Sequence, residues 1–272
     1  MNFDQDIKNL NYYGYTILKN FLKKDECQYY IELIEKYANE DYGKKLEEKI
    51  TTGWDGGWMH NLQNKDLEFL KLITNEYLEK IFKHKLNDKF YRSQEGEDPN
   101  YILQLLSARS SGKQYLDLHT DMRSKSTYDS TLGLTALWYL TDTNKENGCT
   151  FLVPGSHNLN LKEGENSYIT DRDFKNVLPI EVEAGDVIIF DQGIWHGAFE
   201  NKTSQKPWRL MAGLSRWWIK QSFDIPASLP DNFYQKLSNK EKSILGFCSM
   251  PPKDEFERLS MSCKYIDLKK EI

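Results

Sequence analysis

Residues 179–197, "PIEVEAGDVIIFDQGIWHG", contain two β-rich runs (179–183 and 186–190) on either side of the turn signal "AGD". Further β-rich runs occur earlier and later in the chain, over residues 100–108, 131–140, 149–153 and 208–219. No long helical pattern interrupts them, whereas parallel strands need long, usually helical crossovers. The sequence therefore predicts an antiparallel sandwich or barrel.

Helical patterns flank this β region. Apolar residues recur every three or four positions over residues 23–38 and again over residues 66–82, and the tail returns to helix from about residue 231. Between the first two helices, the stretch "TTGWDGGWMHN" (51–61) is typical of an irregular loop. We expect one domain over residues 1–272, with a helical N-terminal part (about 1–90), a β core (about 91–220) and a helical tail (about 221–272).

Composition excludes several classes of protein. Of 272 residues, 39% are hydrophobic, which is enough for a core, but no run approaches the roughly 20 apolar residues of a membrane span. The net charge is -5 and the lysines are scattered, so we expect no nucleic-acid binding. The four cysteines show no CxxC pair, and the first residues lack the pattern of a secretory signal. These features favour a cytoplasmic protein with reduced thiols; they predict no oligomeric state.

The stretch "LDLHTDMRS" (116–124) places His119 and Asp121 two positions apart. In an extended strand both side chains point to the same face. Such a pair is most often a surface feature, but His196 follows a strand in an aromatic, glycine-containing setting and is a candidate third ligand. Two imidazoles and one carboxylate are the ligand set of non-haem Fe(II) oxygenases. Zinc hydrolases use similar donors, so the residues alone leave the metal open.

Arg209 opens the otherwise apolar run "WRLMAGL". A buried guanidinium is costly unless it meets an anion, and its planar fork suits a carboxylate. Either Arg209 pairs with a protein carboxylate, or it holds the far carboxylate of a diacid that chelates the metal. 2-Oxoglutarate is such a diacid, and the upstream ligand candidates favour this second interpretation.

Five segments in order resemble the phytanoyl-CoA dioxygenase family of Fe(II)/2-oxoglutarate oxygenases. The most recognisable is "LTDTNKENGCTFLVPGSH" (140–157), and the resemblance covers nearly the whole chain. The other segments are "YGYTILKNFLKKDEC" (13–27), "LHTD" (118–121), "EVEAGDVIIFDQGIWHGAFENKTSQKPWRL" (181–210) and "SILGFCSMPP" (243–252).

This resemblance implies a mainly β fold with helical flanks around a double-stranded β-helix (jelly-roll, cupin-like) core. It also implies Fe(II) held by His119, Asp121 and His196, with 2-oxoglutarate held by Arg209 and O2 as co-substrate. The expected reaction is hydroxylation of an unactivated carbon, with release of succinate and CO2. Because Asp121 is present, halogenation is disfavoured. Many members have a hydroxyl residue two positions after the distal histidine, where this chain has Ala198.

The sequence also offers candidate contacts for 2-oxoglutarate and the substrate, and it leaves two alternative functions open. Gln104 and Thr150 are candidate contacts of 2-oxoglutarate. We expect a small-molecule substrate, and basic residues just after the ligand pair suggest that it is anionic; its identity and the position oxidised are not predicted. Two alternatives are a cupin-like isomerase or hydrolase using zinc or manganese, and a non-catalytic small-molecule binding module. The candidate substrate contacts are Trp54, Trp58, His60, Arg123 and Lys125.

Overall fold

The computed structural model describes residues 1–39, 58–88, 99–122, 131–159, 177–249 and 254–256. The chain divides into two compact units. Unit 1 comprises Met1–His60 and Ser107–Met211, and unit 2 comprises Asn61–Leu106 and Ala212–Ile272. The division falls within two strands, β3 (Tyr101–Ser110) and β10 (Trp208–Arg216), so each unit contains part of both. The expected single domain over 1–272 stays a prediction.

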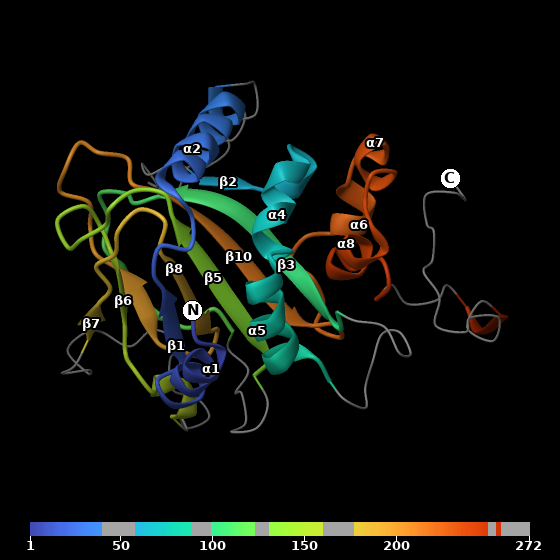
Figure 1. The fold of residues 1–272 in the computed structure, drawn as a ribbon, viewed down its shortest axis with the longest axis horizontal. Helices are drawn as coiled ribbons and strands as arrows, with labels where there is room; N and C mark the ends of the chain where they lie inside the picture. Colours follow the sequence, from blue (N-terminus) through green and yellow to red (C-terminus); the bar gives the residue numbers. More distant parts are fainter. Residues whose placement is uncertain (40–57, 89–98, 123–130, 160–176, 250–253, 257–272) are drawn as a thin grey trace. The chain divides into compact units, whose positions relative to one another are not determined.

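The described strands form two antiparallel sheets (Figure 1). The larger has the order β1-β8-β5-β10-β3-β2, and the smaller has the order β4-β9-β6-β7. The bounds of the further strands in the larger sheet are β1 (Tyr15–Leu18), β2 (Trp58–His60), β5 (Gly133–Tyr139) and β8 (Val187–Asp191). Those of the smaller sheet are β4 (Leu116–His119), β6 (Thr150–Leu152), β7 (Leu178–Pro179) and β9 (His196–Ala198).

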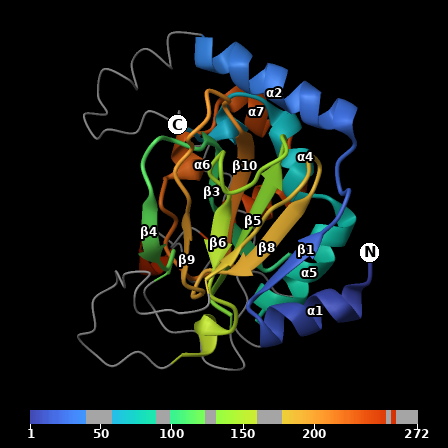
Figure 2. The same ribbon diagram turned by 90° about the vertical axis from the view of Figure 1, so that its left-hand side faces the viewer.

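The core of unit 1 lies between these sheets. Buried side chains of β5 and β8, among them Tyr139 and Phe190, pack in one cluster with Leu152 of β6. Figure 2 shows β4, β9 and β6 on one side of this unit and β5 and β8 on the other. The smaller sheet contributes a second cluster of buried side chains, which come from β4, β6 and the residues next to β6 and β9: Leu118, Phe151, Val153 and Trp195. The alternation of side chains along each strand leaves His119 and His196 on the opposite face of β4 and β9 from this second cluster.

Helices accompany the strands in both units. In unit 1, α1 (Phe3–Tyr12) starts at Asn2, whose side chain accepts a hydrogen bond from the backbone N–H of Gln5, and α2 (Lys24–Asn39) forms where the 3.6-residue pattern predicts it. A short 3-10 helix, η3 (Ser156–Asn158), follows β6. Unit 2 contains η1 (Leu62–Asn64), η2 (Leu67–Phe69), α4 (Leu70–Ile73), α5 (Glu76–Leu86), α6 (Ile225–Ser228), α7 (Asp231–Tyr234) and α8 (Asn239–Ile244).

The expectation of a mainly β, antiparallel protein with helical flanks is confirmed, but three local predictions are wrong. The helix expected over 66–82 is interrupted because Asn75 caps a new helix, accepting from the N–H groups of Tyr77 and Leu78. The tail helix is split likewise by a capping box at Ser238. Residues 58–60 form β2 instead of part of a loop, because they pair with β3. Among the described helices, none is both long enough and apolar enough to cross a bilayer.

Candidate metal centre

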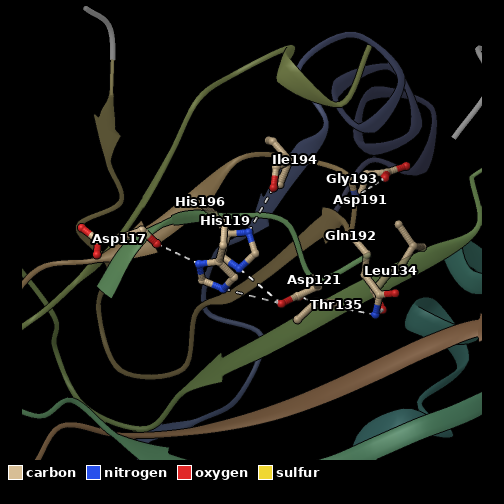
Figure 3. Close-up of polar contacts among 10 residues, drawn as sticks. All are labelled: Asp117, His119, Asp121, Leu134, Thr135, Asp191, Gln192, Gly193, Ile194 and His196. Atoms are coloured by element: carbon tan, nitrogen blue, oxygen red, sulfur yellow. Dashed lines mark hydrogen bonds and ion pairs between the residues drawn. The ribbon is translucent and has the colours of Figure 1, made fainter. Parts of the chain in front are cut away.

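The three predicted ligands converge in unit 1, where β4 pairs with β9 (Figure 3). His119 and His196 are direct antiparallel partners, which places both imidazoles on one face of the sheet. Their ring centroids lie 4.4 Å apart. Asp121 follows β4, and its Oδ1 lies 3.5 Å from Nε2 of His196 and 3.9 Å from Nε2 of His119. The three donor atoms all lie within 4.8 Å of one another.

Backbone carbonyls fix which nitrogen of each imidazole faces this cluster. Nδ1 of His119 lies 2.9 Å from the carbonyl oxygen of Asp117, and Nδ1 of His196 lies 3.0 Å from that of Ile194. A carbonyl only accepts, so each Nδ1 carries a proton and the Nε2 of each ring faces Asp121; in a neutral imidazole held this way, Nε2 is the nitrogen with the lone pair that can bind a metal. This is the arrangement in which metal-binding histidines are held by a hydrogen bond on the other nitrogen.

A short relay of hydrogen bonds orients Asp121. The hydroxyl of Thr135 on β5 donates to Oδ2 of Asp121 over 2.8 Å, and Nε2 of Gln192 lies 3.3 Å from the Thr135 hydroxyl oxygen (Figure 3). The backbone N–H of Met122 donates to the carbonyl of Gln192, which ties the segment after β4 to the end of β8. The relay engages Oδ2 and leaves Oδ1 facing the imidazoles.

Burial and the neighbouring charges shift the pKa values of the three side chains in this cluster in different directions. Desolvation opposes ionisation of Asp121, but the neighbouring His196 and the hydrogen bonds from His196 and Thr135 outweigh it and lower the pKa of Asp121 to about 2. Burial, together with His196, lowers the pKa of His119. Burial also acts to lower the pKa of His196, but the carboxylate of Asp121 outweighs it and raises that pKa. The carboxyl group of Asp121 is therefore ionised at neutral pH, the state in which it can bind a metal.

The cluster fits a metal that needs open coordination positions. It offers two neutral imidazole nitrogens and one carboxylate, and no further His, Cys, Asp or Glu joins the group within the part of the chain that the structure describes. The side chains of His119 and Asp121 are 22% and 31% exposed, so these two candidate ligands are partly accessible to solvent. The 2-His-1-carboxylate set with vacant positions suits non-haem Fe(II).

Arg209 is buried in the same unit, with 4% of its surface exposed. Its Nη1 donates a 2.8 Å hydrogen bond to the hydroxyl of Ser111, which in turn donates to the carbonyl of Gly148. Burial lowers the pKa of Arg209, and the side chains of Tyr139 and Cys149 lie close enough to oppose that shift. Among the described residues Arg209 bonds a hydroxyl and no protein carboxylate, which leaves its fork available for a ligand.

The other predicted cofactor contacts lie in different units. Thr150 of β6 pairs with Ala198 of β9 in unit 1, and its hydroxyl accepts a 2.8 Å hydrogen bond from Tyr139. Gln104 lies in unit 2, where its amide contacts the hydroxyl of Ser215, the carbonyl of Ile219 and the N–H of Ser222. A role of either residue toward 2-oxoglutarate stays a prediction, and the contacts of Gln104 give that role no support.

Two of the predicted substrate contacts lie on β2. The rings of Trp58 and His60 are 4.4 Å apart, and the guanidinium of Arg109 on β3 lies over the Trp58 ring at 5.1 Å from its centroid. Arg109 is not among the residues predicted from the sequence, although it lies within a largely apolar strand, the same pattern that singles out Arg209. Trp54, Arg123 and Lys125 lie outside the described residues.

A family model described as "Phytanoyl-CoA dioxygenase (PhyH)" matches residues 10–211. Because this match covers more than half of the chain, the protein belongs to the phytanoyl-CoA dioxygenase family. Among curated proteins it is similar to dioxygenase olcK of Penicillium canescens, with 29% identity over 250 residues, 82% of this chain and 74% of the relative. With several other curated relatives the match is shorter and spans less than half of their length.

Solved structures show the same fold at low sequence identity. HygX from Streptomyces hygroscopicus, with nickel and 2-oxoglutarate bound, is 15% identical with a TM-score of 0.59, over 80% of this chain and 88% of that chain. The non-heme alpha ketoglutarate dependent epimerase SnoN from nogalamycin biosynthesis is 19% identical with a TM-score of 0.59, over 78% and 82%. These likenesses confirm the predicted jelly-roll core. The family match confirms the predicted phytanoyl-CoA dioxygenase family, and HygX structures with iron, or with nickel and 2-oxoglutarate, agree with the predicted cofactors Fe(II) and 2-oxoglutarate.

Proposed function

We propose that this protein is an Fe(II)- and 2-oxoglutarate-dependent hydroxylase that oxidises an unactivated carbon of a small-molecule substrate, releasing succinate and CO2. The observation that supports it most is the convergence of His119, Asp121 and His196 within 4.8 Å. In this proposal Nε2 of each histidine and Oδ1 of Asp121 hold Fe(II) on one side. When bound, the metal supplies the activation of O2 at its open positions.

The surroundings of Arg209 support the assignment of the co-substrate. 2-Oxoglutarate carries a second carboxylate that needs a cationic partner in a buried site, and Arg209 offers a planar fork there. Hydroxyl groups accompany it: Ser111 contacts the guanidinium directly, and the bonded pair Tyr139–Thr150 lies opposite Ala198. In this proposal the hydroxyl groups of Ser111, Tyr139 and Thr150 take the place of the hydroxyl group that many family members carry at the position of Ala198.

Two other functions are weaker candidates. A zinc- or manganese-dependent isomerase or hydrolase would need no diacid, so it gives Arg209 no role. A non-catalytic binding module would not need three intact ligands with both imidazoles held in the metal-binding tautomer. A third alternative is epimerisation of the substrate at one carbon, because SnoN is named as an epimerase. Labelled O2 separates hydroxylation from epimerisation: one oxygen atom enters succinate in either case, but only hydroxylation places the other in the oxidised substrate.

The co-substrate assignment is tested by titrating 2-oxoglutarate into the anaerobic Fe(II) protein and following the visible charge-transfer absorption. Arg209→Gln is expected to raise the concentration for half-saturation by roughly 10- to 100-fold, because a charge-assisted contact contributes about 1.5–3 kcal/mol. Arg216→Gln is the matched control, since Arg216 is a buried arginine of the same strand whose Nη1 lies 3.1 Å from Oδ2 of Asp88. Equal saturation of the Arg209 variant and the wild type would remove Arg209 from the site.

A further inference from the structure

One peptide group links the candidate ligand His196 to a buried serine. Its carbonyl, that of Ile194, lies 3.0 Å from Nδ1 of His196 and accepts the hydrogen bond from that nitrogen (Figure 3). Its N–H, that of Trp195, donates a 2.8 Å hydrogen bond to the hydroxyl oxygen of Ser156. A trans peptide group is planar and rigid, with its C=O and N–H on opposite sides. Ser156 therefore holds one side of the group whose other side holds His196.

The backbone on either side of this peptide group is anchored as well. The N–H of Ile194 donates to the carbonyl of Asp191, over 2.9 Å, and the carbonyl of Trp195 accepts a 2.9 Å hydrogen bond from the N–H of Val153. With both neighbours fixed, the group between them can change orientation by rotating about the line that joins its two Cα atoms. The hydroxyl of Ser156 opposes that rotation, so it decides where the Ile194 carbonyl points.

Ser156 is itself held by the N-terminal segment of unit 1. It begins η3, directly after Gly155, whose φ of 79° glycine adopts without strain. The N–H of Gly155 donates a 2.7 Å hydrogen bond to the carbonyl of Tyr13, and Nε2 of His157 lies 3.2 Å from the carbonyl oxygen of Asn11. These contacts, one on each side of Ser156, attach η3 to the end of α1.

Burial makes the hydrogen bond from Trp195 to Ser156 important. Ser156 is 3% exposed and Trp195 is 1% exposed, and the ring of Trp195 packs in the cluster with Leu118 and Phe151. A buried N–H that loses its acceptor keeps the full cost of its desolvation. Removal of the hydroxyl therefore favours any tilt of the peptide group that brings its N–H to another acceptor, and the Ile194 carbonyl turns with it.

We propose that Ser156 is a positioning residue for the metal centre, acting through the peptide group of Ile194 and Trp195 to keep the proton of His196 on Nδ1. Oδ1 of Asp121 lies 3.5 Å from Nε2 of His196 and competes as an acceptor for that proton. A proton on Nε2 removes the lone pair that binds metal. The proposal rests on the proposed function, and it gives a role to the "PGSH" stretch (154–157), which supplies no ligand in the cluster.

The first test uses the metal-free full chain at a pH where both imidazoles are neutral. Long-range proton–nitrogen NMR spectra report which ring nitrogen of a histidine carries the proton. His196 should be protonated at Nδ1 in the wild type, and Ser156→Ala should add a population protonated at Nε2. Ser156→Thr keeps the hydroxyl and should restore the wild-type spectrum. His119 is the internal control, because its Nδ1 contacts the carbonyl of Asp117 on β4 and should not change.

The second test measures the binding of Co(II), whose visible spectrum reports the geometry of its ligands. Ser156→Ala should bind Co(II) about tenfold more weakly than wild type in competition with a chelator, with an altered spectrum, as expected for a group that orients a metal ligand. Thr16→Val is the matched control, since Thr16 is a buried residue of the same unit whose hydroxyl donates a 2.7 Å hydrogen bond to Asp6. It should lose stability and keep the wild-type affinity and spectrum.

A further variant serves if Ser156→Ala does not fold. Ser156→Cys nearly preserves the volume of the side chain but offers a weaker acceptor, so it should show the same changes to a smaller extent.

The outcomes separate the proposal from its alternatives. A folded Ser156 variant with the tautomer of the wild type, or a wild-type His196 protonated at Nε2, would overturn it. So would an equal loss of Co(II) affinity in Thr16→Val, because the effect would then follow from lower stability alone. A wild type that binds no metal, while Ser156→Ala still changes the tautomer, would contradict the proposed function and leave the link from Ser156 to His196 in place.

Discussion

The hydroxyl of Thr135 donates a 2.8 Å hydrogen bond to Oδ2 of Asp121, from a strand of the opposite sheet. One carboxylate oxygen is thereby fixed to the rigid β5 strand, while the other faces the imidazoles of His119 and His196. The side chain of Asp121, which follows the end of β4, is thus oriented by a strand of the other sheet. Its position depends on packing between sheets and not on β4 alone.

Thr135→Val should weaken metal binding by about tenfold or more, because loss of a residue that orients a metal ligand typically costs 10- to 100-fold in affinity. Thr135→Ser keeps the hydroxyl and should bind close to wild type. Competition with a chromophoric chelator measures both affinities. Equal affinity of the valine and wild-type proteins would show that the hydrogen bond has no part in holding Asp121.

Gly197 lies between the candidate ligand His196 and Ala198 on β9, at a point where atoms of β4 and β6 approach its backbone closely. A Cβ atom there would overlap the carbonyl oxygen of Leu116 on β4 and the ring of Phe151 on β6. Gly197→Ala should therefore reduce the free energy of unfolding by about 1–3 kcal/mol, the usual cost of overpacking. Denaturant unfolding of the metal-free protein measures it.

A second substitution locates the origin of that cost. Phe151→Leu in the Gly197→Ala background removes one overlap and leaves the backbone carbonyl of Leu116 in place. The double variant should recover only part of the lost stability. Full recovery would mean that β4 and β9 tolerate the extra methyl group, and that the close approach of their backbones is not needed.

Glu79 on α5 should make unit 2 sensitive to acid. Desolvation acts to raise its pKa, but its ion pairs with Lys240 and Lys83 outweigh that effect and lower the pKa below the ordinary 4.5. A carboxyl with a lowered folded-state pKa stabilises the protein fully above 4.5, and this stabilisation is lost as the pH falls through the folded-state value.

Glu79→Gln should therefore be less stable than wild type at pH 7 by about 1 kcal/mol or less, given that both lysines are partly exposed. The difference should shrink as the pH falls below 4.5. Urea unfolding at several pH values measures it, with Glu68→Gln as a control, since Glu68 forms a more exposed pair with Lys71. A difference that does not depend on pH would rule out the ion pairs as its source.

The sequence predicted most of the strands of the two sheets and the three candidate ligands, which converge in the structure, because the patterns that reveal them are local. The apolar run of β5 and the turn before β8 are each visible in a short stretch of sequence, and the position of His196 after a strand made it the candidate third ligand. The composition around Trp58–His60 predicts a loop, because these residues become a strand only through their pairing with β3. Arg109, Ser111 and Thr135 gain their importance from neighbours on other strands, which no local pattern reveals.

The most direct measurement adds Fe(II) and 2-oxoglutarate to the protein without oxygen and combines iron analysis with visible absorption. The wild type should bind about one iron per chain and show the weak charge-transfer band of a chelated 2-oxo acid, since two imidazoles and a carboxylate leave positions open for it. His196→Ala, with the same circular dichroism as wild type, should show neither. A folded wild type without the band, or a His196→Ala protein that keeps it, would contradict the assignment of this centre.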